Sequence, residues 1–227
     1  MNRAEIYARL NKFAHPELAE KWDCCGALVE TDKTEIKKIM LALTVTDNIV
    51  KQAEEQHCDM IISHHPLFFV PFRYKNINIF SAHTNLDRAE GGTTDTLVET
   101  LGFSPDKNFA EGFLRYVTVD ISVAELKEKL KKISPNLRCV NNFGVKKLRK
   151  IAFCAGSGSD FLQEAYENDA DALVTGDLKF HTSLESPIVV FDVGHFESEI
   201  LVLPVFEKII DSDAEIIYAK EKSPFLY

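Results

Sequence analysis

The sequence has 227 residues with 45% hydrophobic and 27% charged content, and its formal net charge is −9. This composition is typical of a globular protein with a sizeable core, and the acidic balance argues against nonspecific nucleic-acid binding. Five cysteines without a Cys-x-x-Cys pair indicate a reducing compartment rather than a disulfide framework. The sequence lacks both an apolar run of the ~20 residues that a membrane span needs and a signal-peptide pattern, so we expect a cytoplasmic protein without membrane contact.

Helix and strand patterns alternate along the chain. In the first part, the pattern predicts helices over residues 2–13, 16–22, 47–56 and 91–101, and buried strands over 36–45, 60–62 and 78–82. From residue 104 onward it predicts strands over 115–121, 148–155, 172–175, 188–192 and 214–219, and helices over 123–133, 160–168 and 196–210. Strands that alternate with helices indicate an α/β fold with mostly parallel sheets.

An internal repeat gives the strongest indication of domain organisation. When the numbering is shifted by 112, Asp59-Met60-Ile61-Ile62-Ser63 faces Asp171-Ala172-Leu173-Val174-Thr175, and His83-x-x-x-Asp87 faces His195-x-x-x-Glu199. We therefore predict two related α/β lobes, residues 1–110 and 111–227, in which segments 36–87 and 148–199 correspond.

Two adjacent histidines, His64 and His65, follow the buried strand 60–62. Pro66 blocks further strand pairing, so we expect both histidines on a loop at the carboxyl end of the strand, where ligands bind in open α/β sheets. Imidazole is the commonest metal ligand in proteins, and successive residues at a strand end point to opposite sides. The pair is therefore better suited to two metal ions than to one.

Each half of the repeat also has a histidine after a strand and a carboxylate four residues later. On a helix these two positions share a face, so His195 and Glu199 can converge on one ion, whereas Asn85 favours a loop around His83 and Asp87. Two ions about 3.5–4 Å apart, sharing a bridging carboxylate and a water molecule, would use most of these side chains. Nitrogen and oxygen ligands suit zinc, manganese, iron or nickel and do not select among them. The candidate ligands are His64, His65, His83, Asp87, His195 and Glu199.

A second group of polar residues lies in segment 175–181, the counterpart of the histidine pair in the repeat. His181 and Lys179 are candidates to transfer protons or to hold an anionic substrate group, and Asp177 is a candidate to orient a histidine. The alternative is that these side chains only satisfy the backbone groups of a loop.

Two other features have weaker interpretations. Gly156-Ser157-Gly158-Ser159 precedes a predicted helix and resembles a phosphate cradle, although it lacks the full dinucleotide-binding or P-loop pattern. Phe68, Phe69 and Phe72 are interpreted as core or pocket wall rather than as a platform for nucleic-acid bases.

Four motifs together resemble the Nif-three-like family, whose members are often named homologues of a type-two GTP cyclohydrolase one. The motifs are Ser63-His64-His65-Pro66, His83-Thr84-Asn85-Leu86-Asp87, Thr175-Gly176-Asp177-x-Lys179-x-His181 and Gly194-His195-Phe196-Glu197-Ser198-Glu199. The resemblance covers nearly the whole chain, including Trp22-Asp23-x-x-Gly26. It implies a two-lobed α/β protein with a dinuclear metal site between the lobes, assembled as a toroidal homohexamer, a trimer of dimers.

The family pattern also implies how the ligands are shared. It assigns them by position as follows: His65 with Asp87 on one metal, His64 with His195 on the other, and Glu199 as the bridge. His83 would then lie beside the ligands, although the repeat makes it symmetric with His195, and we follow the family here. Cys24 stands where many members have asparagine, and segment 104–147 is too short for the domain that longer members insert.

Two classes of function fit these observations. The first is a metal-dependent hydrolase, in which two ions lower the pKa of a water molecule and His83 or His181 shuttles protons. The resemblance implies a small-molecule substrate for it, such as GTP or a related nucleotide. The second is a non-enzymatic metal-binding protein, a metal carrier or a regulatory partner, which a buried and fully ligated site would favour. Threading of nucleic acid through a ring is a third idea, and the acidic charge argues against it.

Overall fold

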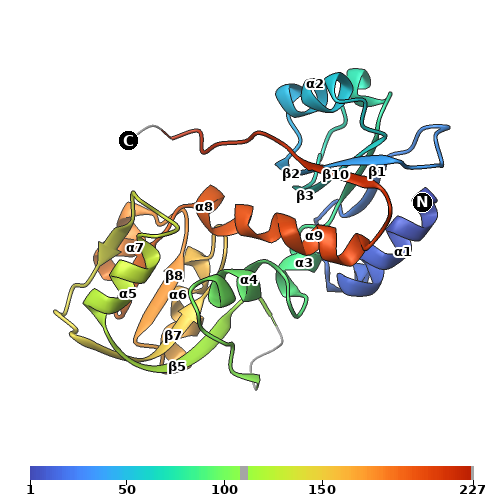
Figure 1. Cartoon of the computed structure of the whole chain (residues 1–227). Helices are drawn as coiled ribbons and strands as arrows, with labels where there is room; N and C mark the ends of the chain where they lie inside the picture. Colours follow the sequence, from blue (N-terminus) through green and yellow to red (C-terminus); the bar gives the residue numbers. More distant parts are fainter. Residues whose placement is uncertain (108–111, 226–227) are drawn as a thin grey trace. The chain divides into compact units, whose positions relative to one another are not determined.

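The computed structural model describes residues 1–107 and 112–225, which divide into two compact units (Figure 1). The first unit contains Met1–Gly92 and Val202–Lys222, and the second contains Thr93–Leu201 with the described residues from Ser223 onward. Each unit is built around one five-stranded sheet, and parallel pairs predominate, which confirms the predicted α/β fold of two lobes. Within the described ranges, the structure has no helix that is long and apolar enough to cross a membrane.

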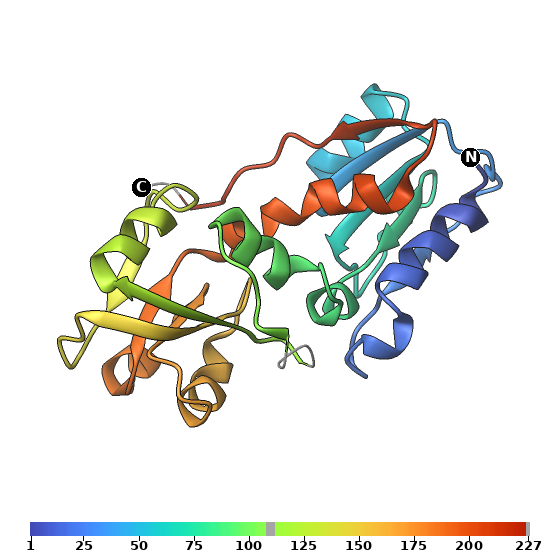
Figure 2. The ribbon, with the colours of Figure 1, turned by 60° about the horizontal axis from the view of Figure 1, so that its bottom comes forward.

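The sheet of the first unit has the strand order β1-β4-β3-β2-β10, and only β1 is antiparallel to its neighbour. Its strands are β1 (Gly26–Val29), β2 (Lys38–Thr44), β3 (Met60–His65), β4 (Asn78–Ser81) and β10 (Glu215–Tyr218). Its helices are α1 (Arg3–Phe13), α2 (Asp47–Glu55), α3 (Thr84–Arg88) and α9 (Leu203–Ile210), with 3-10 turns η1 (Pro16–Leu18) and η2 (Phe72–Tyr74). Helices α1 and α9 lie side by side in both views (Figures 1 and 2).

Capping and burial explain these elements. The side chains of Asn2 and Thr46 accept hydrogen bonds from the amides of Ala4 and Ile49, which satisfies free N–H groups at the starts of α1 and α2. Strands β2 and β3 are buried along almost their whole length, as expected for parallel strands covered on both faces.

The units divide the chain differently from the predicted lobes. The predicted boundary between residues 110 and 111 lies outside the described residues. Segment 202–222 belongs to the first unit because β10 pairs in parallel with β2, with Ile216 beside Ile39. Helix α4 (Thr93–Thr100) belongs to the second unit because its apolar side chains pack into that unit's core. The sequence predicts segment 202–222 in the second lobe and segment 93–100 in the first, so both lie in the other unit of the structure.

The sheet of the second unit has the strand order β5-β7-β8-β9-β6, with an antiparallel strand at each edge. Its strands are β5 (Arg115–Ser122), β6 (Arg138–Val140), β7 (Lys147–Phe153), β8 (Ala172–Thr175) and β9 (Val189–Asp192). Besides α4, its helices are α5 (Val123–Leu130), α6 (Leu162–Glu167), α7 (Phe180–Glu185) and α8 (His195–Glu199), with the 3-10 turn η4 (Ser159–Phe161). A further 3-10 turn, η5 (Ile200–Val202), separates α8 from α9, where one continuous helix was expected.

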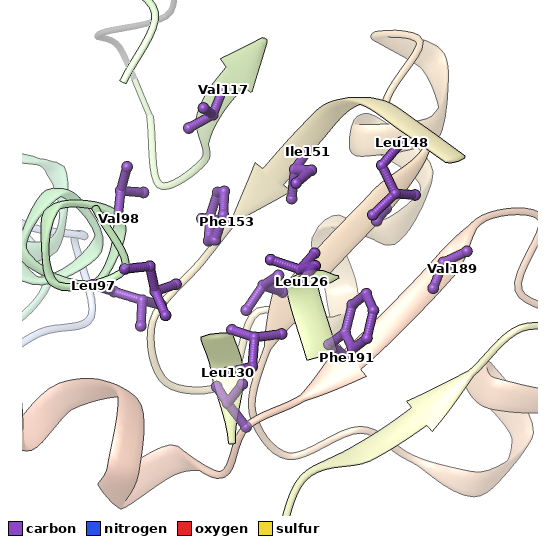
Figure 3. Close-up of a cluster of buried hydrophobic side chains, with 14 of the residues drawn as sticks. Leu97, Val98, Val117, Leu126, Leu130, Leu148, Ile151, Phe153, Val189 and Phe191 are labelled. Atoms are coloured by element: carbon purple, nitrogen blue, oxygen red, sulfur yellow. The ribbon is translucent and has the colours of Figure 1, made fainter. Parts of the chain in front are cut away.

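Apolar clusters cover both faces of the second sheet. On one face, Leu126 and Leu130 of α5 and Leu97 of α4 pack with Phe153 and Phe191 of the strands (Figure 3). The other face carries a separate cluster, to which β7, β8 and β9 and helix α6 contribute. Ser122 starts α5 with a capping box, because it exchanges hydrogen bonds with Glu125.

The internal repeat is visible in the hydrogen bonds of the two units. Asp59 accepts from the amides of Lys37 and Lys38 at 2.7 and 3.1 Å. Asp171 accepts in the same way from the amides of Arg149 and Lys150, at 2.6 and 3.1 Å, and all three positions are shifted by 112. The residue two positions before each aspartate has a left-handed backbone, with φ of 56° and 58°. The two halves therefore share a turn and a strand pairing, as the sequence predicted.

The correspondence shifts by one residue after β3 and β8. Strands β4 and β9 begin 111 positions apart, and so do helices α3 and α8. His83 therefore corresponds to Gly194, the residue before α8, rather than to His195. The apparent symmetry of the two histidines does not extend to their positions in the fold.

Candidate functional site

Three histidines of the first unit form one cluster. His64 and His65 are the last two residues of β3, where a loop was expected, and His83 follows β4, the neighbouring strand. Their ring centroids are 5.0, 5.2 and 5.7 Å apart, and one nitrogen from each ring lies within 4.8 Å of the others. Parallel pairing of β3 and β4 brings the three side chains together because it aligns the carboxyl ends of both strands.

Neighbouring groups fix which nitrogen each ring presents. His64 is fully buried, and its Nδ1 lies 2.9 Å from the carbonyl oxygen of Ala82, so Nδ1 carries the proton and donates it. Its Nε2 faces Asp87, with 3.5 Å to Oδ1. In His65, Nδ1 lies 2.6 Å from the hydroxyl of Thr44. Contacts of this kind fix the orientation of a histidine ring, and they are common behind metal-ligating histidines.

Asp23 holds the third histidine. Its buried carboxylate accepts from His83 Nδ1 at 3.0 Å and from the Thr84 amide at 3.0 Å, and the Thr84 hydroxyl also donates to it. The Cys24 amide and the Cys25 thiol donate to the same carboxylate. Burial alone would raise the pKa of Asp23, but the hydrogen bonds from Cys25, Thr84 and His83 outweigh it and hold the pKa well below its usual range. Asp23 is thus an ionised, buried carboxylate that orients His83.

Sequence reasoning did not assign this role to Asp23. The signal was present, because Trp22-Asp23 was part of the family resemblance, but Asp23 and His83 are 60 residues apart in the chain. The expected loop at His83 was also wrong: residues 84–88 form α3, and the Asn85 side chain accepts from the His83 amide to start the helix.

The second unit carries a histidine between two carboxylates. His195 and Glu199 lie one turn apart on α8, with 2.9 Å between Nε2 and Glu199 Oε2, and Asp177 Oδ2 lies 2.7 Å from His195 Nδ1. Burial alone would lower the pKa of His195, but the hydrogen bonds and charges of Glu199 and Asp177 raise it to about 9. His195 is therefore an imidazolium held between two carboxylates. A divalent cation could supply the positive charge in place of the ring proton.

Glycines make room for these side chains. A Cβ atom on Gly156 would lie 2.9 Å from the carboxyl carbon of Glu199, closer still to Oε1, and 3.5 Å from His195 Nε2. A Cβ atom on Gly176 would lie 2.7 Å from the backbone nitrogen of His195. The carboxylate thus occupies a recess that exists only because residue 156 has no side chain. In the second unit, this recess and the nitrogen and oxygen donors of His195 and Glu199 are of the kind that can hold a divalent metal ion.

Two backbone amides of the glycine-rich segment are not available to cradle a phosphate. The Gly156 amide donates to the Ser198 hydroxyl at 2.9 Å, and the Gly158 amide donates to the Thr175 hydroxyl at 2.8 Å. These two N–H groups are therefore directed into the protein. The segment instead shapes the recess for Glu199.

The segment after β8 divides into two parts. Asp177 lies against His195, which is the orienting role considered from the sequence. Lys179 and His181 are exposed: Lys179 Nζ lies 3.5 Å from Asp160, and the His181 ring contacts Phe180 with centroids 5.5 Å apart. The proton-transfer role of His181 stays a prediction. A cavity of about 280 Å³ lies within the second unit, and its lining includes His195, Asp177, Arg138 and Glu197.

Comparison with known proteins then gives the family. The sequence matches the profile of Duf34/NIF3 (NGG1p interacting factor 3) over residues 1–224. The chain belongs to this family. It is 35% identical to a protein of Clostridium perfringens and 34% identical to one of Campylobacter jejuni, each named "GTP cyclohydrolase 1 type 2 homolog", with 99% and 100% of both chains covered. The fold also matches the structure titled "Reduced HcgD from Methanocaldococcus jannaschii", with a TM-score of 0.85, 29% identity and coverage of 97% of this chain and 98% of that chain.

Proposed function

We propose that this Duf34/NIF3 protein is a metal-dependent hydrolase that uses two divalent ions, zinc, manganese, iron or nickel. The proposed ligands are His64, His65, Asp87, His195 and Glu199, with Glu199 as the bridge. The observation that supports the proposal most is the histidine cluster of the first unit, whose rings are held from behind at Nδ1. Fixed imidazoles cost less to organise around an ion than mobile ones.

The residues around the proposed ligands suit hydrolysis. If bound, two cations would supply a water molecule of lowered pKa and would polarise the substrate's electrophilic centre. His83 exchanges the proton at Nε2, because Asp23 holds the proton on Nδ1. His181 is the second proposed proton carrier, from the exposed start of α7.

The proposed substrate is a nucleotide such as GTP or a related small molecule. The names of the relatives from C. perfringens and C. jejuni support this choice, since both refer to GTP cyclohydrolase. The cavity beside His195 offers room for a small polar group, with the Arg138 guanidinium at its wall. From the family resemblance we also propose a homohexamer, for which light scattering must give six chain masses; a monomer mass would contradict it.

The function is tested by reconstitution. Protein stripped with a chelator is loaded with each of the four metals and assayed against nucleotides and phosphoesters. We expect turnover with at least one metal, and we expect His83→Ala to lose it about 100-fold while keeping its metal. His15→Ala is the matched control. It changes an exposed histidine directly before η1 and should leave turnover unchanged.

A metal-binding protein without catalysis is the alternative. The family description, which refers to an interacting factor, favours it. Full metal occupancy without turnover of any nucleotide or phosphoester would support this alternative and contradict the hydrolase.

A further inference from the structure

Four aromatic side chains of the first unit are largely exposed. Trp22, Phe68, Phe69 and Phe72 are 61%, 62%, 80% and 84% exposed, so the interpretation of the three phenylalanines as core is wrong, while the interpretation as pocket wall stays a prediction. Large aromatic side chains that gather at a surface commonly mark a binding site. We call Trp22 and Phe68 the aromatic pair.

The aromatic pair has the geometry of a stack. The two ring centroids are 6.2 Å apart and the ring planes are inclined by only 27°. Each ring remains more than half exposed although it contacts the other. A third flat ring can therefore extend the stack on an exposed face with offset-stacked contacts.

The aromatic pair is also linked to the candidate site. The Trp22 and His83 rings meet in an edge-to-face arrangement, with centroids 6.1 Å apart and planes at 74°. Trp22 directly precedes Asp23, whose buried carboxylate is fixed by His83, Thr84 and two further donors. The indole is thus anchored in contact with His83, the proposed proton carrier.

We propose that Trp22 and Phe68 bind a planar heteroaromatic ring of the substrate, such as a purine, and hold its reactive part at the histidine cluster. This inference rests on the proposed function and names the substrate class for the same site. A flat ring with polar edges suits a surface that combines two ring faces with the His83 imidazole beside them.

The single tryptophan of the chain makes the proposal measurable. Trp22 fluorescence is recorded while GMP is titrated, with excitation at the red edge of tryptophan absorption, where guanine absorbs little. Ribose 5-phosphate, which has the sugar and phosphate without the ring, is the matched ligand. We expect GMP to quench the fluorescence in a saturable way and ribose 5-phosphate to leave it unchanged.

Variants then locate the binding. Phe68→Leu keeps the reporter and should weaken GMP binding about 5- to 150-fold, the range measured for the loss of one stacking partner. Phe143→Leu changes a 75% exposed phenylalanine of the second unit and should leave the affinity unchanged. Both positions are on the surface, so we expect both variants to fold, which circular dichroism checks.

Four results would overturn the aromatic pair as a ring site. The first three are the absence of quenching by GMP, equal quenching by ribose 5-phosphate, and an unchanged affinity in Phe68→Leu. The fourth is quenching that depends on protein concentration alone, which would show that a second copy of the chain covers the pair.

The titration is repeated with chelated and with metal-loaded protein. GMP quenching without any metal uptake would sustain the aromatic pair and overturn the hydrolase. Metal uptake without GMP quenching would overturn the aromatic pair alone.

Discussion

Gly156 and Glu199 share one recess in the second unit, because the Glu199 carboxylate lies where a side chain at residue 156 would start. Gly156 also has a left-handed backbone, with φ of +67°. An alanine at this position must therefore displace the carboxylate as well as adopt an unfavourable backbone conformation.

Gly156→Ala is expected to weaken metal binding about 10- to 100-fold, since the Glu199 carboxylate loses its position. Gly144→Ala is the matched control: its φ is +64°, but a Cβ atom there meets nothing within 4 Å. Both variants carry the same backbone strain, so only the first should lose metal in an equilibrium dialysis measurement. Equal metal affinities in the two variants would contradict the role of the recess.

Asp23→Asn is expected to lower turnover about 10- to 100-fold with metal content unchanged. Asparagine has one acceptor oxygen and no charge, so it cannot accept from both His83 and the Thr84 amide as the carboxylate does. Nitrogen NMR of the His83 ring should show a mixture of tautomers in place of one. Asp160→Asn removes an exposed carboxylate and serves as the control. An unchanged His83 tautomer in Asp23→Asn would refute the orienting role.

Asp59 should stabilise the first unit in a pH-dependent way. Burial would raise the pKa of Asp59, but Lys33 and the amides of Lys37 and Lys38 outweigh it and lower the pKa. A lowered pKa means that the stabilisation is complete above the ordinary carboxyl pKa of about 3.9 and is lost as the pH falls through the lower folded-state value. We expect Asp59→Asn to cost about 2 kcal/mol at pH 7 in urea unfolding, with the difference from wild type shrinking below pH 4. A difference that stays constant down to pH 3 would contradict this account.

The core of the second unit depends on α5. Leu126 is fully buried against the sheet (Figure 3). Leu126→Ala should lower the free energy of unfolding by about 2–5 kcal/mol, from lost apolar burial and the cavity left behind. Leu184→Ala, a 59% exposed leucine on α7 of the same unit, should change it by less than about 0.5 kcal/mol. Urea unfolding followed by circular dichroism measures both, and similar effects for the two variants would contradict the packing argument.

Local patterns in the sequence were sufficient for much of the fold. Apolar runs predict the buried strands β2, β3, β7 and β8. The repeat is visible in the sequence at Asp59 and Asp171, and in the structure these two residues make the same backbone hydrogen bonds. The short edge strands β1 and β6 were missed because three or four partly exposed residues carry little pattern. The return of β10 to the first sheet depends on pairing with β2 across most of the chain, which no local pattern contains.

The candidate site shows the same division. Residues near a strand's carboxyl end, such as His64 and His195, were found from their position in the pattern. Asp23 and Gly156 were not, because their roles depend on side chains that only the fold brings close, His83 and Glu199. The symmetry between His83 and His195 was misleading because the repeat shifts by one residue before α3 and α8.

The measurement that tests the central claim most directly is metal content per chain by mass spectrometry, on protein purified without chelator. The account predicts about two metal ions per wild-type chain, and a large loss in His64→Ala and in Glu199→Ala, one ligand from each unit. His15→Ala, the exposed control, should keep both ions. Wild-type protein that is metal-free and takes up no zinc, manganese, iron or nickel on reconstitution would contradict the account.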